Sequence, residues 1–156
     1  MARKLFVYAL IFVLCLSGMA YAKSISLGSY TIEIPDSFVN GDVTEEEREA
    51  GLTAYYKSEA TLLDFDVYQL SGKTGTLAEV AAEDAKIFDG TDITADLEIN
   101  GVKAASYRSK QESEDSMYDV LSYVFGENGE YIRLVFWLDG ENAEAEAKAI
   151  INSLKK

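Results

Sequence analysis

The chain has 156 residues, of which 27 are acidic and 14 basic, and its formal net charge at pH 7 is −13. A surface of this charge repels nucleic acid and anionic lipid, so we expect neither as a partner. Histidine is absent, which excludes histidine-dependent catalytic triads and leaves zinc and haem sites without their usual ligand. Any metal would have to be a hard, oxygen-binding cation such as calcium.

Residues 1–22 have the pattern of a secretory signal peptide. A basic start at residues 3–4 is followed by an apolar run from Leu5 to Leu16, which is too short to span a bilayer. An Ala-x-Ala cleavage site ends at Ala22. We therefore expect cleavage and a secreted or periplasmic protein without stable membrane insertion, with an uncleaved anchor as the alternative.

Cys15, the only cysteine, lies inside this predicted signal peptide. A lipoprotein would need a small residue where Leu14 stands, so lipid attachment is not expected. Cleavage would leave residues 23–156 with 12 basic and 27 acidic residues and no cysteine. That mature chain could form no disulfide, and acid–base chemistry would depend on carboxylates, tyrosine or lysine.

The first part of the mature chain alternates between apolar and polar residues. Ile25 and Leu27 alternate with serines, and the alternation resumes after Gly28-Ser29 at residues 30–34, as is typical of a half-buried strand. Pro35, the only proline, is expected to end the strand because proline cannot donate a hydrogen bond to a neighbouring strand. Phe38 and Val39 are then expected to return under the sheet.

Two capping boxes predict the starts of helices. Residues 44–47 and 76–79 both have threonine followed three positions later by glutamate. Gly51 is expected to end the first helix after barely two turns, and Gly90 to close the second segment. The buried stripe of the second helix is expected to contain Leu77, Val80, Ala81, Asp84, Ile87 and Phe88.

The middle of the chain is expected to form strands. Residues 52–57 and 62–70 predict two strands around a short turn. Residues 93–100 and 101–109 predict a hairpin around Asn100-Gly101, with Ile99 opposite Val102, Leu97 opposite Ala104 and Ala95 opposite Ser106. The charged run KQESEDS at 110–116 is expected to be a solvated loop.

A second hairpin is expected from residues 117–125 and 131–138, with paired residue numbers that sum to 257. Both of its faces are largely apolar, which predicts a central place in the sheet with both sides covered. The chain then ends with a predicted helix at 141–156, acidic at its start and basic at its end, as the helix dipole favours. Its buried stripe is expected to contain Ala143, Ala147, Ile150, Ile151 and Leu154.

These elements predict a single α+β domain over residues 23–156, with a central antiparallel sheet of about six to seven strands and helices packed on it. Their order, together with the stretches IEIPDSF, INGVKAASYRSK and AIINSLKK, resembles the PsbP-like family of small extracytoplasmic domains. The resemblance implies an α/β/α sandwich. Photosynthetic members bind a membrane complex and help retain ions, partly through histidine, whereas this chain has no histidine and matches none of the family's metal ligands.

Arg133 is the centre of the candidate ligand-binding site. It alternates with Tyr131, Val135 and Trp137 on one face of the second hairpin, and Tyr118 could join them. An arginine beside aromatic rings could receive an anionic or aromatic group. In the alternative, its stem only covers the apolar strand and its head pairs with an acid. Three further tyrosines could extend the patch if their strands are neighbours: Tyr55, Tyr68 and Tyr107.

Two acidic groups are the other candidates. Asp64 and Asp66 project from the same strand face about 7 Å apart, a separation used by inverting glycosidases, although two acids on a strand are usually just its solvent face. A calcium site is the second possibility, and its ligands would be Asp89, Asp92 and Asp96. The segment lacks the EF-hand pattern, so a turn that ends the helix is the alternative.

No catalytic or cofactor-binding motif is recognisable, so we expect no catalytic residues and no cofactor. The favoured function is an exported, non-enzymatic binding or accessory domain that recognises a protein or small-molecule partner through the tyrosine, tryptophan and arginine face. The alternative is a carboxylate-dependent hydrolase or a calcium-binding accessory protein. A purely structural role in envelope maintenance would leave the same sequence pattern.

Overall fold

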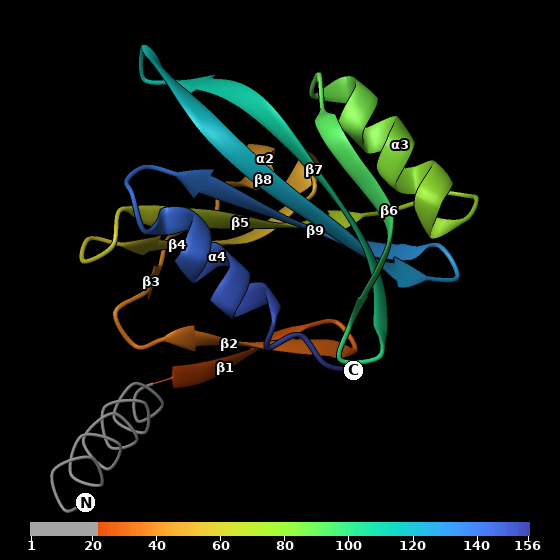
Figure 1. Ribbon diagram of the computed structural model, residues 1–156, viewed down its shortest axis with the longest axis horizontal. Coiled ribbons are helices and arrows are strands. Elements are labelled where there is room, and N and C mark those ends of the chain that lie inside the picture. Colours follow the sequence, from red (N-terminus) through yellow and green to blue (C-terminus); the bar gives the residue numbers. More distant parts are fainter. Residues whose placement is uncertain (1–21) are drawn as a thin grey trace, which may run out of the picture.

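The computed structural model describes residues 22–156, so Cys15 and all of the predicted signal peptide except Ala22 lie outside the described residues. No helix within residues 22–156 is long and apolar enough to cross a membrane. The elements in chain order are β1 (Ala22–Leu27), β2 (Tyr30–Pro35), β3 (Val39–Asn40), α2 (Glu45–Glu49), β4 (Leu52–Ser58), β5 (Leu63–Leu70), α3 (Leu77–Ile87), β6 (Thr91–Ile99), β7 (Val102–Ser113), β8 (Ser116–Glu127), β9 (Glu130–Leu138) and α4 (Ala143–Ile151) (Figure 1).

The large sheet has seven strands in the order β3-β4-β5-β9-β8-β7-β6, and all neighbours are antiparallel. This confirms the predicted α+β class and the antiparallel sheet. β9 is the middle strand and β8 lies beside it, with paired residue numbers that sum to 257 as predicted. A two-residue turn at Asn128-Gly129, both at positive φ, fixes this register.

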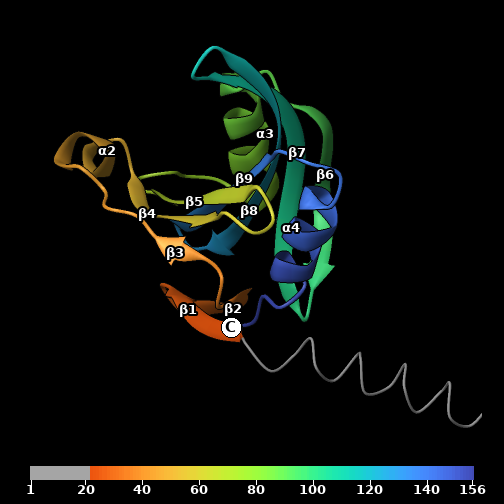
Figure 2. The same cartoon turned by 90° about the vertical axis from the view of Figure 1, so that its left-hand side faces the viewer.

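Adjacent residues on the strands face opposite sides of the sheet, and each side has its own core. Ala104 packs in the first core with α4 and the β1–β2 hairpin, whereas Ala105 packs in the second core with α3. Figure 2 shows α3 and α4 on opposite sides of the sheet. The helix, sheet and helix layers therefore form the predicted α/β/α sandwich.

The first two strands form a hairpin of their own, a two-stranded sheet apart from the large one. Gly28, at φ +63, turns the chain between them. Pro35 is the last residue of β2, as predicted, and Phe38 is buried. The expectation for Val39 was wrong, since its side chain is 67% exposed. Successive side chains of an extended segment point to opposite sides, so only one of this pair can face the core.

Both predicted capping boxes are present, and each is closed in both directions by its threonine and glutamate. α3 buries four residues of its stripe, Val80, Ala81, Asp84 and Ala85. Ile87 was expected in this stripe but is 62% exposed. It lies at one margin of the stripe and Ala85 at the other, and the sheet covers the margin that carries Ala85.

The predicted loop at 110–116 is instead the tip of a long hairpin. β7 continues to Ser113 and β8 begins at Ser116, so only Glu114 and Asp115 form the turn, both at positive φ. Charged residues suit strands whose side chains face water, and Lys110 pairs with Asp119 across this hairpin at 3.2 Å.

The β6–β7 hairpin keeps the predicted register only near its turn. Ile99 pairs with Val102 and Leu97 with Ala104, as Asn100-Gly101 predicts. Irregularities in β6 then shift the pairing, and Thr94 rather than Ala95 lies opposite Ser106. A tight turn controls the register of nearby pairs, and each β-bulge adds an unpaired residue beyond it.

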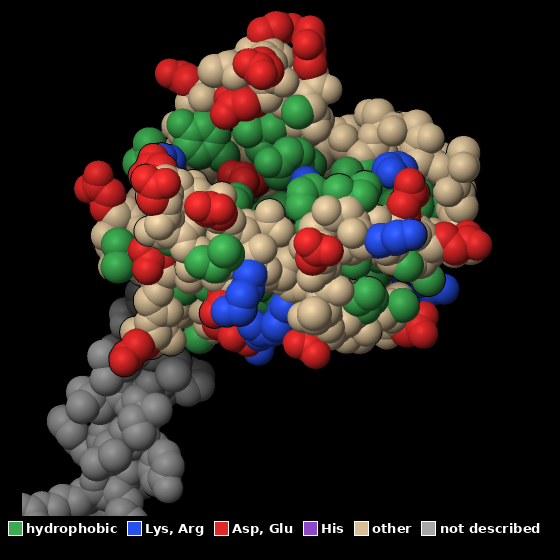
Figure 3. Space-filling model, turned by 90° about the horizontal axis from the view of Figure 1, so that it is seen from above, with side chains coloured by type: hydrophobic (Ala, Val, Ile, Leu, Met, Phe, Trp, Pro, Cys, Tyr) green, Lys and Arg blue, Asp and Glu red, His purple; other side chains and the backbone are tan. Residues whose placement is uncertain are grey.

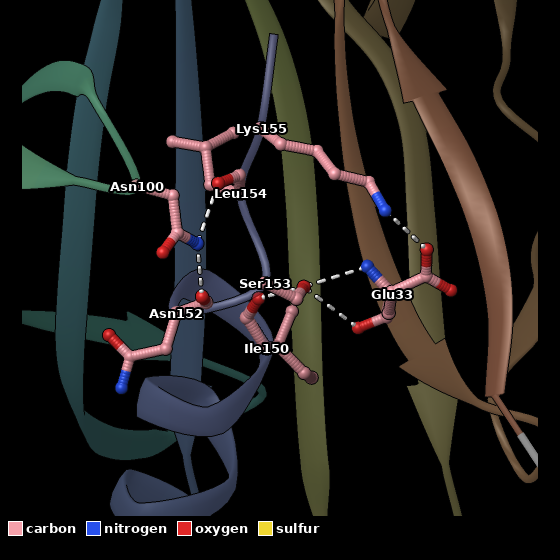
Figure 4. Close-up of polar contacts among 7 residues, drawn as sticks. All are labelled: Glu33, Asn100, Ile150, Asn152, Ser153, Leu154 and Lys155. Carbon is pink, nitrogen blue, oxygen red and sulfur yellow. Dashed lines mark hydrogen bonds and ion pairs between the residues drawn. The ribbon is translucent and has the colours of Figure 1, made fainter. Parts of the chain in front are cut away.

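The last helix is shorter than predicted, since α4 ends at Ile151 and an extended tail follows, although all five residues of the expected stripe are buried. Contacts with distant segments hold this tail (Figure 4). Asn100 Nδ2 donates to the carbonyl oxygens of Asn152 and Leu154 at 2.7 and 3.0 Å. Ser153 Oγ accepts from the backbone N–H of Glu33 at 2.7 Å. Bonds to distant backbone thus replace the last turns of the expected helix.

Candidate functional site

The second face of the large sheet is only partly covered. α3 packs over β6, β7 and β8, whereas the same face of β4, β5 and the end of β9 lines an open groove of about 630 Å³. α2 borders one side of this groove through Glu47, and the β7–β8 turn contributes Glu114. Seen from above, hydrophobic side chains and an acidic group lie at the bottom of a hollow with acidic side chains around it (Figure 3).

Aromatic residues from four strands line the groove. Trp137 on β9 donates a 2.8 Å hydrogen bond from Nε1 to Oδ2 of Asp66. The ring of Tyr118 on β8 meets the Trp137 ring edge-on, with centroids 6.1 Å apart. Tyr55 on β4 and Tyr68 on β5 also line the groove. These four aromatic side chains are of the rigid, amphipathic type that is common at binding surfaces.

The candidate carboxylates Asp64 and Asp66 lie in the same groove. Burial raises the pKa of Asp66 above its ordinary value, and the bond from Trp137 only partly opposes this. Burial also raises the pKa of Asp64, against the attraction of Lys57. Both groups therefore hold a proton more readily than an exposed aspartate does.

Arg133 is not in the groove but buried beneath α3. Its Nη1 pairs with Oδ1 of Asp84 at 2.9 Å, and its guanidinium lies 4.3 Å from the ring centroids of both Tyr68 and Phe88. Tyr107 donates a 2.8 Å bond from its hydroxyl to the same aspartate. The sequence allowed either a ligand-binding arginine or one whose head pairs with an acid. The structure shows the second arrangement, and Asp84 of α3 is the acid.

The four predicted ligand-binding residues are thus divided. Trp137 and Tyr118 lie together in the groove, whereas Tyr131, like Arg133, is buried, and its hydroxyl donates to the Gly75 carbonyl at 2.8 Å. The partner of Arg133 was not predicted from the sequence. The available signal was Asp84 itself, an acid within the otherwise apolar stripe of α3.

Tyr107 belongs to the buried pair rather than to the groove. Burial raises the pKa of its hydroxyl to about 12, and the nearby Asp84 carboxylate acts in the same direction. The hydroxyl consequently stays protonated and serves as a hydrogen-bond donor. Its partner aspartate is held by an arginine on one side and a tyrosine on the other.

The suggested calcium ligands do not come together. Among residues 22–156, no three acidic side chains are placed to hold a metal ion. Asp89 and Asp92 are exposed and both have positive φ; Asp89 lies in the turn between α3 and β6, and Asp92 is the second residue of β6. Asp96 is exposed on the edge strand β6. The segment is therefore arranged as a turn that ends a helix, which was the alternative to a calcium site.

No family model matches the chain, and no match was found among curated proteins. Solved structures do match. The solution structure of the cyanobacterial PsbP protein CyanoP from Synechocystis sp. PCC 6803 has a TM-score of 0.63 over 88% of this chain and 93% of that one, at 15% identity. This chain has a PsbP-like fold.

Two further structures share this PsbP-like fold. A Bacteroides thetaiotaomicron crystal structure has a TM-score of 0.61 at 16% identity over 88% of this chain, which spans only 48% of that protein. LpqN, described as involved in cell envelope biogenesis of Mycobacterium tuberculosis, has a TM-score of 0.52 at 14% identity, with 85% of this chain and 88% of that one covered. At these identities the likeness establishes the fold and leaves the activity to the site.

Proposed function

We propose that this chain is an exported, non-enzymatic binding or accessory domain that receives a partner in the groove between α2 and the β7–β8 turn. The observation that carries the proposal is the half-covered sheet face, on which Trp137 and Tyr118 line an open groove instead of packing under a helix. The signal-peptide pattern of residues 1–22 supports export to a secreted or periplasmic location. The fold likeness to LpqN supports a role at the cell envelope.

Trp137 and Tyr118 are the side chains expected to contribute most to the free energy of partner binding. Tryptophan and tyrosine lose little conformational entropy on binding and supply large contact areas, so they often contribute most of the binding energy of an interface. The hydrogen bond from Trp137 to Asp66 already fixes the indole ring. A partner would therefore meet a preorganised surface.

The test is capture of the native partner. The purified domain, with a photo-crosslinker in the groove, would be incubated with the native envelope fraction, and crosslinked products would be quantified by mass spectrometry. Trp137→Ala and Tyr118→Ala are expected to remove the main product. Ile93→Ala is the matched control, because Ile93 is an exposed apolar residue on β6 outside the groove. Products that persist equally in all three variants would refute the proposal.

A carboxylate-dependent hydrolase is the second candidate. The observation in its favour is that Asp64 and Asp66 share the groove and both have raised pKa values, as a general acid needs. Asp64→Asn and Asp66→Asn would abolish any glycosidase activity found in a substrate screen. Activity that survives both substitutions, or none in the unmodified protein, would remove this candidate.

A further inference from the structure

The charge of the groove indicates what kind of partner it takes. We propose that its occupant is a basic, extended segment of a partner protein, with a lysine or arginine side chain held between Trp137, Tyr118 and the carboxylate of Asp66. This inference rests on the proposed function and gives it a ligand class. It also favours a polypeptide over a small molecule.

The charge of the groove is complementary to that of a cationic segment. Six carboxylates line the groove, and Lys57 is the one basic residue among them. The acids come from separate parts of the chain: Glu47 from α2, Asp64 and Asp66 from β5, and Asp139 from the segment after β9. This convergence produces a negative potential that a concave, partly desolvated surface strengthens. A cationic segment matches that potential, whereas an anionic one is repelled.

The aromatic rings also favour a cationic occupant. The protein's own cations already lie on two of them, with Lys57 Nζ 5.5 Å from the Tyr55 centroid and the Arg133 guanidinium 4.3 Å from that of Tyr68. The rings of Trp137 and Tyr118 carry no cation from residues 22–156. Tryptophan is the strongest of the aromatic residues in attracting a cation. The adjacent Asp66 would add an ion pair to that attraction.

Burial of Asp66 makes a cation more favourable here than on an exposed carboxylate. Its pKa is raised by burial, with smaller contributions in the same direction from Asp64 and Glu47. Trp137 and Arg133 act in the opposite direction without cancelling the effect. A lysine or arginine from a partner would stabilise the ionised carboxylate and would bind more tightly in return.

The size and openness of the groove favour a polypeptide. Its volume of about 630 Å³ exceeds what one side chain fills, and its acids extend from α2 to the β7–β8 turn. An extended segment can place successive cations on successive acids, and an isolated small cation can meet only one or two of them. Figure 3 shows that the hollow is open to solvent, so a segment can enter along its length.

The inference can be tested with a short synthetic peptide of alternating lysine and alanine. Trp137 is the only tryptophan of the chain, so its fluorescence reports directly on the groove, and calorimetry measures the Kd independently. We expect saturable binding that Asp66→Asn or Asp64→Asn weakens roughly tenfold each, as loss of a close charge pair does. Asparagine keeps an oxygen that can accept the bond from Trp137, and circular dichroism would verify that both variants fold.

Asp96→Asn is the matched control, because it makes the same charge change on β6, outside the groove. It is expected to alter the Kd less than twofold. Equal weakening by this control would show that only net charge matters and would overturn the inference, as would an absence of saturable binding. An acidic peptide of equal length is expected not to bind, and lysine amide at least a hundredfold more weakly than the peptide. Equal affinity for lysine amide would overturn the assignment to a polypeptide.

The outcomes separate this inference from the proposed function. If the basic peptide fails to bind while native capture still depends on Trp137, the groove binds a partner of another chemistry and only the inference is wrong. If Trp137→Ala leaves native capture unchanged while the peptide binds, the groove recognises cations but is not where the captured partner docks. The proposed function would then be wrong.

Discussion

The carboxylate of Asp84 on α3 and the guanidinium of Arg133 on β9 form a 2.9 Å ion pair in which both residues are buried. The pair joins the helix to the middle strand of the sheet. A buried ion pair is expensive to break, because removal of one partner leaves the other charged without compensation. The net contribution of the intact pair to stability is smaller than the cost of removing one partner, because both charges lose their hydration on folding.

The first prediction follows from this asymmetry. Asp84→Leu or Arg133→Met alone should lower the free energy of unfolding by about 3–5 kcal/mol. The double variant leaves no uncompensated charge, and its loss should be only about 1–3 kcal/mol, as expected when the buried Tyr107 hydroxyl loses its acceptor. Urea unfolding followed by Trp137 fluorescence would measure all three. The Nε of Arg133 is buried and has no hydrogen-bond partner among the described residues. The double variant also removes this unsatisfied donor, which favours its folded state.

The exposed pair of Lys73 and Glu83, at 3.1 Å, serves as the comparison for this prediction. Glu83→Gln should change the free energy of unfolding by less than about 1 kcal/mol, since solvent screens a surface pair. A cost below about 1 kcal/mol for Asp84→Leu would show that Arg133 is not left as an uncompensated buried charge when its partner is removed.

The second prediction concerns the two helix caps. Thr76→Ala should destabilise the protein by about 1 kcal/mol, because Thr76 accepts from the Glu79 N–H and caps a helix that packs against the sheet. Thr44→Ala removes an equivalent cap from α2, which buries no residue. Its effect on global unfolding should be much smaller. Equal losses would mean that α2 is part of the cooperative core.

Local signals account for the part of the fold that was predicted from sequence. The two capping boxes, the Asn100-Gly101 turn and the apolar alternation of β8 and β9 each act over a few residues, and each was confirmed. Resemblance of the whole element order to PsbP-like domains was confirmed at the level of the fold.

Long-range partners account for what was missed. Nothing in residues 22–35 reveals that β1 and β2 form a separate two-stranded sheet instead of joining the large one, since the alternating pattern is the same for either arrangement. The end of α4 at Ile151 depends on the bonds that hold the tail. At the site, placing Tyr55 and Tyr68 beside Trp137 requires β4, β5 and β9 to be neighbours, and the sequence does not specify that order.

The third prediction concerns the tail. Asn100→Gly should keep the turn, because glycine adopts positive φ freely, and should lose both side-chain bonds to the tail. We expect a loss of about 1–2 kcal/mol. Hydrogen exchange should accelerate at the Lys155 amide, which donates to the Thr31 carbonyl at 3.0 Å.

Asn128→Gly is the matched substitution for this experiment. Asn128 has the equivalent place in the β8–β9 turn, with φ 58, and makes no side-chain hydrogen bond among the described residues. It should leave the exchange of the tail unchanged. If both variants accelerate exchange at the Lys155 amide alike, the tail does not depend on the Asn100 side chain.

The fourth prediction is a pH dependence at Asp66. Burial holds its pKa in the folded protein above the ordinary value of 3.8. The stabilising contribution of such a group is fully present below the ordinary pKa and is lost as the pH rises through the raised one. Asp66→Asn should therefore be more stable than the unmodified protein at neutral pH, and this advantage should shrink as the pH falls and disappear below about pH 3.8.

Each variant must be compared with the unmodified protein at the same pH, because the contribution of Glu79 to stability depends on pH in the opposite direction to that of Asp66. Bonds from Thr76 lower the pKa of Glu79, so its contribution is present above the ordinary pKa and is lost as the pH falls through the lowered one. Glu79→Gln should thus be less stable at neutral pH and converge with the unmodified protein in acid. Urea unfolding of the three proteins between pH 3 and pH 7 would measure both trends. If Asp66→Asn is the less stable protein at neutral pH, a favourable contact of the Asp66 carboxylate outweighs its loss of hydration, and the groove holds that charge without a partner.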